Sequence, residues 1–295
     1  MKSEAVAFPA IRSRAADFVA LTKPRLNLLV IATAAAGYYL GTSSDLDYLR
    51  FTNTVLGTAL VAGGASALNQ VYERRSDALM HRTRQRPLPG GRLQPGEASW
   101  FALLLSTSGL LILALGANLL AAMVALTTLV TYVACYTPLK ARTSLATVVG
   151  AIPGALPPMI GWAGATNVLS REAWILFAIV FLWQMPHFLA IAWLYREDYA
   201  RAGFPMLPVV EPDGRSTARQ VVAYAAALLP VSLAPTAVGL ASASYFAGAL
   251  ALGAAFLVLA MRFSRSRGRG DARWLFLGSI LYLPLIWILM IVTRV

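Results

Sequence analysis

Three side chains that carry oxygen atoms recur at a spacing of four residues in the most polar stretch of the chain. Asn69, Glu73 and Asp77 lie within NQVYERRSDALMHRTRQRPLPGG, residues 69–91. At 3.6 residues per turn, each step of four residues drifts by only about 40° around a helix. The three side chains are therefore expected to project from one helix face, where their oxygen atoms can act on the same ligand.

A second pair of acids occurs much later in the chain. Glu197 and Asp198 lie within YREDYARAGFPMLPVV, residues 195–210. Carboxylate and amide oxygens suit a hard cation such as Mg²⁺, which takes one or two carboxylates and leaves its other positions to water and phosphate oxygens. If the two stretches meet in the fold, they form a candidate site for a divalent cation.

Basic side chains accompany the acids and could bind phosphate oxygens directly, because arginine forms charge-assisted, often bidentate hydrogen bonds. They are Arg74, Arg75, Arg82, Arg84, Arg86 and Lys140. The combination favours a site that holds a metal ion and a diphosphate. A plainer interpretation, in which Glu73 and Asp77 pair with neighbouring arginines in a solvated loop, stays open on spacing alone.

The elements that must position these residues are membrane helices. Hydrophobic residues make up 58% of the 295 residues and charged residues 13%, against about 25% charged residues in a soluble domain. Nine apolar blocks approach the length of about 20 residues that crosses a bilayer, near 26–42, 54–72, 99–117, 119–136, 144–163, 173–194, 219–240, 244–261 and 274–293. Blocks this long without polar alternation predict helices and not the strands of a barrel. The expected fold is an all-α integral membrane bundle of nine transmembrane helices.

The basic residues predict how this bundle sits in the membrane. With the N-terminus inside, 22 of the 25 Lys and Arg fall on the inside, and only Arg50, Arg171 and Arg294 fall outside. Because cytoplasmic loops carry an excess of basic residues, we expect a multi-pass protein of the cell (inner) membrane. Its N-terminal segment (1–25) and polar loops are cytoplasmic, and its membrane domain (26–295) ends on the opposite side. The net charge of +12 then reflects topology and attraction to anionic lipid, so no nucleic-acid partner is expected.

Two inside loops are longer than the others. They span about 73–98 and 195–218, follow the second and the sixth predicted span, and contain the acids. Long loops in a compact fold usually carry function. Their separation by four helices suggests two four-helix units plus a ninth helix. The single cysteine, Cys135, lies inside the fourth span, which excludes a disulfide within the chain and predicts a packing role.

Four ordered segments give the chain a resemblance to a known family. The stretch NQVYERRSDALMHRTRQRPLP resembles the first acidic motif of the intramembrane aromatic prenyltransferases, the UbiA superfamily. Its N-x-x-x-E-x-x-x-D pattern, followed by M-x-R-T-x-x-R-P, is similar to the haem-modifying branch. Segments 136–163 (YTPLKARTSLATVVGAIPGALPPMIGWA), 181–193 (FLWQMPHFLAIAW) and 196–210 (REDYARAGFPMLPVV) also look like that branch. The likeness runs from about Leu21 to the end of the chain.

The resemblance implies a nine-helix bundle around a central cavity. It also implies transfer of the farnesyl group of farnesyl diphosphate to the 2-vinyl group of haem b, with addition of water to give haem o for terminal oxidases, and a need for Mg²⁺. By position, Asn69, Glu73 and Asp77 match the first motif and Asp198 matches the second, so these four are the expected catalytic and metal-binding residues. Other members usually carry a second acid four residues after Asp198, where this chain has Ala202. This departure puts a symmetric pair of metal ions in doubt.

Further residues are expected to bind the substrates: Arg82, Arg86, Lys140, Tyr136, Tyr195 and His187. A prenyl carbocation needs shielding from water, and aromatic π-faces can stabilise it, which makes candidates of Tyr132, Tyr136, Trp183 and Trp193. An ionisable residue within a span, such as His187, is a functional candidate. Packing, contact with the haem iron, contact with a propionate and contact with the attacking water all stay open for it. Arg92, nearer the third span, is expected to act only as an orientation charge.

Two other functions stay open on the sequence. The Gly and Pro residues of AIPGALPP, residues 151–158, are of the kind that interrupt transporter helices. However, the charges gather on one side, whereas an alternating-access transporter needs matching features on both. The other alternative is a prenyltransferase of the same superfamily that acts on a quinone precursor. The expected partners are farnesyl diphosphate, haem b and the lipid bilayer, and docking onto the next haem-modifying enzyme of the pathway stays open.

Overall fold

The computed structural model describes residues 13–43 and 45–295, and within them every regular element is a helix. The helices that match the predicted blocks are α2 (Pro24–Gly41), α3 (Tyr48–Leu79), α4 (Pro95–Gly116), α5 (Leu119–Val130), α7 (Ala146–Ala155) with α8 (Pro157–Thr166), α9 (Arg171–Leu194), α12 (Arg215–Ala237), α13 (Ala243–Ser266) and α14 (Arg269–Val292). Residues 1–12, with Lys2 and Arg12 of the predicted N-terminal segment, lie outside the described residues.

The described helices account for the predicted number of spans. Eight of them are long and apolar enough to cross a membrane alone, and the number reaches nine when α1 (Arg14–Leu21) and α2 count as one span bent by 47°. α2 is not among the eight, and its first turns carry the polar residues Arg25 and Asn27. The chain is therefore an integral, multi-pass membrane protein with the predicted all-α architecture.

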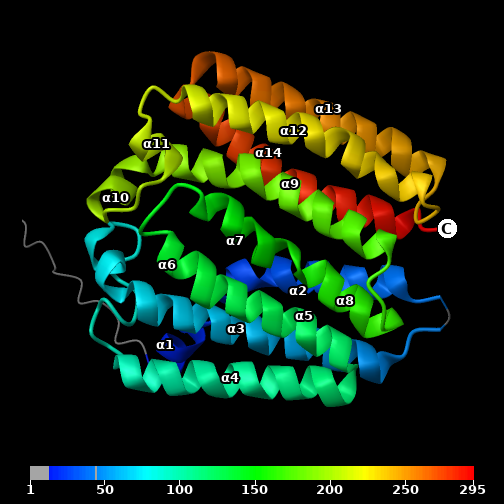
Figure 1. Cartoon of the computed structure of the whole chain (residues 1–295), viewed down its shortest axis with the longest axis horizontal. Coiled ribbons are helices and arrows are strands. Elements are labelled where there is room, and N and C mark those ends of the chain that lie inside the picture. Colours follow the sequence, from blue (N-terminus) through cyan, green and yellow to red (C-terminus); the bar gives the residue numbers. More distant parts are fainter. Residues whose placement is uncertain (1–12, 44) are drawn as a thin grey trace, which may run out of the picture.

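The helices form two layers, which Figure 1 shows one above the other. One layer contains α2, α3, α4, α5 and α8, and the other contains α9, α12, α13 and α14. α14 packs against α9 and α13, so it belongs to the second layer. The grouping of two four-helix units plus a separate ninth helix was therefore wrong, because the additional helix is the fifth span, α7 with α8.

Small residues hold the fifth span against the first. A Cβ atom at Gly161 of α8 would collide with the carbonyl oxygen of Ala34 in α2, and one at Gly37 would collide with the carbonyl of Pro158. Membrane helices pack most closely where small residues let the backbones approach. The span breaks at Leu156, directly before Pro157. The break lets α8 lie along α2 while α7 packs against α9.

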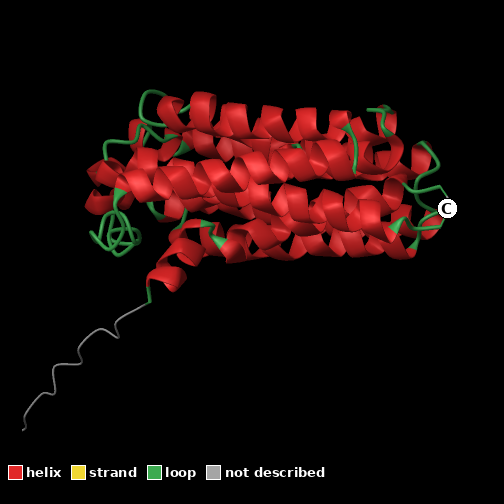
Figure 2. Ribbon diagram, turned by 90° about the horizontal axis from the view of Figure 1, so that it is seen from below, coloured by secondary structure: helices red, strands yellow, loops and turns green. Residues whose placement is uncertain are grey.

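The polar loops gather at one end of the bundle. Figure 2 shows the helices running along the long axis of the molecule, with loops at the two ends. The end opposite the C-terminus contains the turns after α3 and the short helices α10 (Arg196–Arg201) and α11 (Leu207–Val210). Cys135 is exposed, so its predicted packing role was wrong.

Candidate active site

The first acidic motif lies on a helix that continues beyond the predicted span. α3 runs two turns further than the block near 54–72, and its last turns carry Asn69, Glu73 and Asp77. All three side chains face the interior and are 3%, 5% and 1% exposed. The four-residue spacing therefore produces the expected single face. The two acids do not lie in a solvated loop, although Asp77 does pair with a nearby arginine, Arg86.

Each carboxylate on this face is paired with a cation. Lys140 Nζ lies 3.0 Å from both carboxylate oxygens of Glu73. Arg86 donates to Asp77 Oδ2 at 2.8 Å, whereas the buried Asp77 Oδ1 has no hydrogen-bond partner. Thr83 fixes the turn after α3 by donating its hydroxyl to the Asp77 carbonyl oxygen. A buried carboxylate oxygen without a partner is costly, so Asp77 Oδ1 marks a place where a ligand would be stabilised.

Asn69 is bound by a residue that the sequence did not single out. Lys23 Nζ donates to Asn69 Oδ1 at 3.0 Å, and the Asn69 amide donates to Thr137 Oγ1 at 3.2 Å. Lys23 lies at the break between α1 and α2 with a left-handed backbone, φ 48°, and lines a cavity of about 400 Å³ beside that break. The only signal in the sequence was a lysine directly before the proline that opens a membrane helix, Pro24.

A π-helix places Lys140 opposite Glu73. The fourth span continues from α5 into η1 (Thr131–Tyr136), a π-helix, and then α6 (Thr137–Leu139). π-turns inside membrane or soluble helices occur frequently at functional sites. Tyr132 and Tyr136 stack here with ring centroids 5.4 Å apart, and the Tyr136 ring lies against Gly150 of α7, where a Cβ would not fit.

The second acidic segment turns one acid inward and one outward. Asp198 of α10 is 8% exposed and ion-paired with Arg201, whereas Glu197 is exposed. Burial raises the pKa of Asp198, but the hydrogen bonds from Arg201 and the His81 backbone outweigh it and hold the pKa below its ordinary value. Asp198 is therefore ionised at neutral pH and can act as a ligand.

Aromatic contacts join the two polar loops. A small apolar cluster of the loop end contains Met80, Ala192, Tyr199, Phe204 and Met206. Arg82 donates to the Tyr199 hydroxyl at 2.8 Å and lies 5.3 Å and 4.9 Å from the ring centroids of Tyr195 and Tyr199. Lys140 Nζ lies 4.6 Å from the Phe204 ring centroid. The predicted residues Arg82, Tyr195 and Lys140 thus come together at one end of the bundle.

Arg92 has a structural partner. Its Nε donates to both carboxylate oxygens of Asp17 at 3.0 Å, and its Nη2 donates to the Gln85 carbonyl oxygen. Asp17 of α1 is buried. Arg92 therefore attaches α1 to the loop before α4, and the expectation that it is only an orientation charge was wrong.

The remaining aromatic candidates and His187 lie in the second layer. Trp183 is buried and donates its indole N–H to the Ser279 carbonyl oxygen at 2.8 Å. Trp193 packs on Phe263 at 5.6 Å between centroids. These contacts give both tryptophans a packing role. His187 faces α14, where its Nδ1 lies 2.7 Å from Ser279 Oγ.

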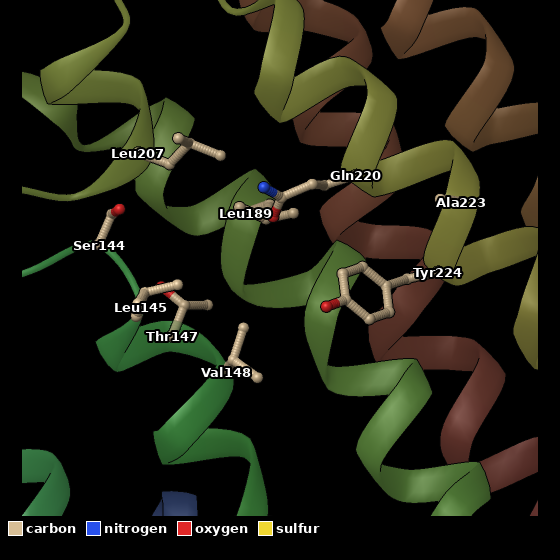
Figure 3. Close-up of a pocket in the computed structure, with 9 residues that line it drawn as sticks. All are labelled: Ser144, Leu145, Thr147, Val148, Leu189, Leu207, Gln220, Ala223 and Tyr224. Carbon is tan, nitrogen blue, oxygen red and sulfur yellow. The ribbon is translucent and has the colours of Figure 1, made fainter.

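A lateral groove lies between α7, α9, α11 and α12, as Figure 3 shows. Its volume is about 370 Å³, and its lining consists of Ser144, Leu145, Thr147, Val148, Leu189, Leu207, Gln220, Ala223 and Tyr224. None of the predicted site residues lines it. The acid–base cluster is therefore defined by its side-chain contacts, and the central cavity that the resemblance implies stays a prediction.

The donor set limits what the cluster can hold. The described residues contain no group of three or more His, Cys, Asp and Glu side chains arranged around one point. Instead, buried acids alternate with Lys23, Lys140 and Arg86. Such an arrangement suits a ligand that carries both signs of charge, namely a divalent cation together with an anion of several oxygens.

Comparisons with known proteins show which family the chain is similar to. A model of the UbiA prenyltransferase family matches residues 30–286. A protoheme IX farnesyltransferase of Solibacter usitatus (strain Ellin6076) is 50% identical over 287 residues, which cover 94% of this chain and 98% of the relative. A protoheme IX farnesyltransferase of Myxococcus xanthus (strain DK1622) is 47% identical over 284 residues, covering 96% and 95%.

Solved structures share the fold at much lower identity. A structure of a digeranylgeranylglyceryl phosphate synthase superposes with a TM-score of 0.80 at 15% identity, covering 95% of this chain and 98% of that chain. A UbiA homolog from Archaeoglobus fulgidus bound to GPP and Mg²⁺ gives a TM-score of 0.68 at 16% identity, covering 93% and 99%. The fold, the matched family model and the close relatives lead to one conclusion: the chain belongs to the UbiA prenyltransferase family, in the branch of its protoheme IX farnesyltransferase relatives.

Proposed function

We propose that the protein transfers the farnesyl group of farnesyl diphosphate to the 2-vinyl group of protoheme IX (haem b), with addition of water, to give haem o and diphosphate. The observation that carries the proposal is the buried face of α3, where Asn69, Glu73 and Asp77 each contact a cation. The relatives named protoheme IX farnesyltransferase support the choice of acceptor.

The reaction sets the electrostatic task of the site. The bond between C1 of the farnesyl chain and the diphosphate oxygen breaks, and the diphosphate leaves with the electron pair. The π-electrons of the vinyl group form the new carbon–carbon bond to C1. Water then adds to the carbocation left on the neighbouring vinyl carbon and loses a proton. Negative charge develops on the diphosphate, and positive charge develops on carbon.

The basic side chains supply the stabilisation of the leaving group. Lys23, Arg86 and Lys140 are held by their contacts with the α3 face, so the positions of these groups are fixed before the reaction begins. Preorganised charges aimed at a developing anion usually make the largest contribution to catalysis. Arg82, oriented by Tyr199, adds a planar donor group that matches phosphate oxygens.

Mg²⁺ fits the acids of this site. We propose that Asn69, Glu73, Asp77 and Asp198 hold it, and the unpartnered Asp77 Oδ1 is the oxygen atom that gains most from a cation. Few carboxylates suffice because Mg²⁺ keeps positions for water and substrate phosphates. When bound, the ion supplies further neutralisation of the diphosphate. The Mg²⁺ and GPP in the related archaeal structure support this assignment.

Aromatic residues at the loop end exclude water from the carbon chain. Tyr132 and Tyr136 of η1 stack on each other shortly before Lys140, which follows α6, and Tyr195 lies next to Arg82. We assign these rings to the carbocation, whose positive charge their π-faces attract. The excess of basic residues at the same end of the bundle supports a cytoplasmic location for this end and for the N-terminal segment.

The proposal is tested with membranes that contain the protein, supplied with farnesyl diphosphate and either haem b or 4-hydroxybenzoate. The expected result is a haem product whose mass has increased by one farnesyl group and one hydroxyl group, and no product from 4-hydroxybenzoate. Prenylation of 4-hydroxybenzoate instead would refute the haem assignment. Membranes containing the Asp77→Asn variant serve as the control for background transfer.

A further inference from the structure

The Nδ1 atom of His187 is tied to the neighbouring helix in a way that fixes its tautomer. Nδ1 lies 2.7 Å from Ser279 Oγ on α14. The Ser279 hydroxyl donates its hydrogen to the Phe276 carbonyl oxygen at 2.6 Å. Because a hydroxyl carries one hydrogen, Nδ1 must be the donor in the contact with Ser279. In the neutral ring, Nε2 then carries an unshared electron pair.

The surrounding side chains fix the plane of the ring. Trp183 stacks on His187 with centroids 5.1 Å apart, and Phe276 stacks on it at 5.2 Å. Trp183 is itself held by its hydrogen bond to the Ser279 carbonyl oxygen, and Ser279 is fully buried. Nε2 has no hydrogen-bond partner among the described residues, and the His187 side chain is only partly buried. The lone pair is therefore oriented, and the side chain that carries it is not fully buried.

A histidine that donates from one ring nitrogen and leaves the other free has the arrangement that proteins use to orient metal ligands. We propose that Nε2 of His187 is an axial ligand of the iron of the haem substrate. This inference rests on the proposed function, and it names the contact by which the porphyrin is held. A propionate is excluded as the partner of a neutral Nε2, because an atom with a lone pair and no hydrogen cannot donate to a carboxylate.

The position of His187 agrees with a division of the site between the two substrates. α9 continues for seven residues after His187 to Leu194, which is about 10 Å at 1.5 Å per residue. The acids lie at the loop end, on the last turns of α3 and on α10. Iron bound to His187 would thus lie deeper in the bundle than the diphosphate, and the vinyl groups at the porphyrin edge stay free to react.

The test uses the whole protein in detergent, loaded with haem b, and detects the bond between iron and imidazole by resonance Raman and pulsed EPR spectroscopy. The chain contains two histidines, so His81→Ala is the matched control for His187→Ala. We expect the imidazole signal in the wild type and in His81→Ala, its loss in His187→Ala, and its return when free imidazole is added to His187→Ala. Ser279→Ala should weaken haem b binding by about 10- to 100-fold.

Metal-free protoporphyrin IX separates ligation from packing. Its affinity should be the same in the wild type and in His187→Ala, whereas haem b should bind His187→Ala less tightly. An equal loss for both porphyrins, or an imidazole signal that persists in His187→Ala, would overturn the assignment. Haem o formation is measured on the same wild-type preparation. Transfer without an iron–imidazole signal would refute the ligation by His187 but not the proposed function. If neither haem binding nor transfer occurs, the proposed function is refuted as well.

Discussion

Lys140→Met should leave the Glu73 carboxylate buried without its cation. Nζ lies 3.0 Å from both oxygens, and the two side chains are only 10% and 5% exposed. With an effective dielectric constant of about 20, two charges at this distance attract by about 5 kcal/mol. The contact of Nζ with the Phe204 ring adds roughly 1 kcal/mol. Because breaking a buried pair on one side typically costs about 3–5 kcal/mol, we expect Lys140→Met to lower the free energy of unfolding by that amount.

The double variant Glu73→Gln/Lys140→Met removes both charges and should recover most of the stability. Replacing a whole buried pair with neutral groups is often close to neutral, so we expect this variant to lie within about 2 kcal/mol of the wild type. The free energy of unfolding is measured by SDS titration in mixed micelles, followed by circular dichroism. Arg142→Met, an exposed position two residues away, should change it by less than about 0.5 kcal/mol.

Farnesyl transfer should be lost in the single and the double variant alike, since both residues belong to the site. The double variant is thus expected to be nearly as stable as the wild type but inactive. A loss below about 1 kcal/mol for Lys140→Met would show that water solvates the pair. A double variant as unstable as Lys140→Met would show that the lysine stem, and not its charge, stabilises the fold.

Three further expectations concern haem o formation by purified protein. Asp77→Asn should lower the rate by about 10²- to 10³-fold without preventing membrane insertion. Excess chelator should abolish the activity of the wild type. Full activity of the variant, or of the wild type in chelator, would refute the metal assignment. Asp198→Asn should lower the rate at least about tenfold, because Asp198 faces inward. Glu197→Gln should keep a rate near that of the wild type, because Glu197 is exposed. Comparable losses in the two variants would show that both acids reach the ligand. Arg82→Lys should impair transfer at unchanged stability, because lysine lacks the planar donor group. Arg92→Lys should leave the kinetics unchanged and lower the stability by about 1 kcal/mol, because Arg92 contacts Asp17. The opposite pattern in melting and kinetic measurements would contradict the assignment of Arg82 to the substrate and Arg92 to the fold.

The periodic features of the site could be predicted from the sequence. Asn69, Glu73 and Asp77 share a face because a helix repeats every 3.6 residues, and this relation needs no knowledge of the neighbouring helices. The inward turn of Asp198 followed from its position next to Glu197 and from the resemblance. Helix ends and breaks were less certain, since the break at Leu156 depends on how α8 packs along α2.

Three polar contacts of the site could not be predicted, because their partners come from distant segments. Lys23 lies 46 residues before Asn69, and the basic-residue count assigned it only to topology. Lys140 lies 67 residues after Glu73, and a π-helix, which has no reliable sequence signal, sets its direction. Asp17 lies 75 residues before Arg92, and only the docking of α1 brings the two together.

The π-helix in the fourth span also determines which changes of chain length the protein can tolerate. η1 closes i→i+5 hydrogen bonds, as from the Thr137 N–H to the Tyr132 carbonyl oxygen. Deleting one residue between Thr131 and Tyr136 would let the span continue as an ordinary α-helix, so insertion into the membrane would survive. A π-turn holds one residue more than an α-turn, so this deletion would keep Lys140 directed toward Glu73. Deleting one residue of α5 instead would turn Lys140 away from Glu73 by about 100°. The π-helix is therefore the place in this span where one residue can be lost without changing the direction of a charge.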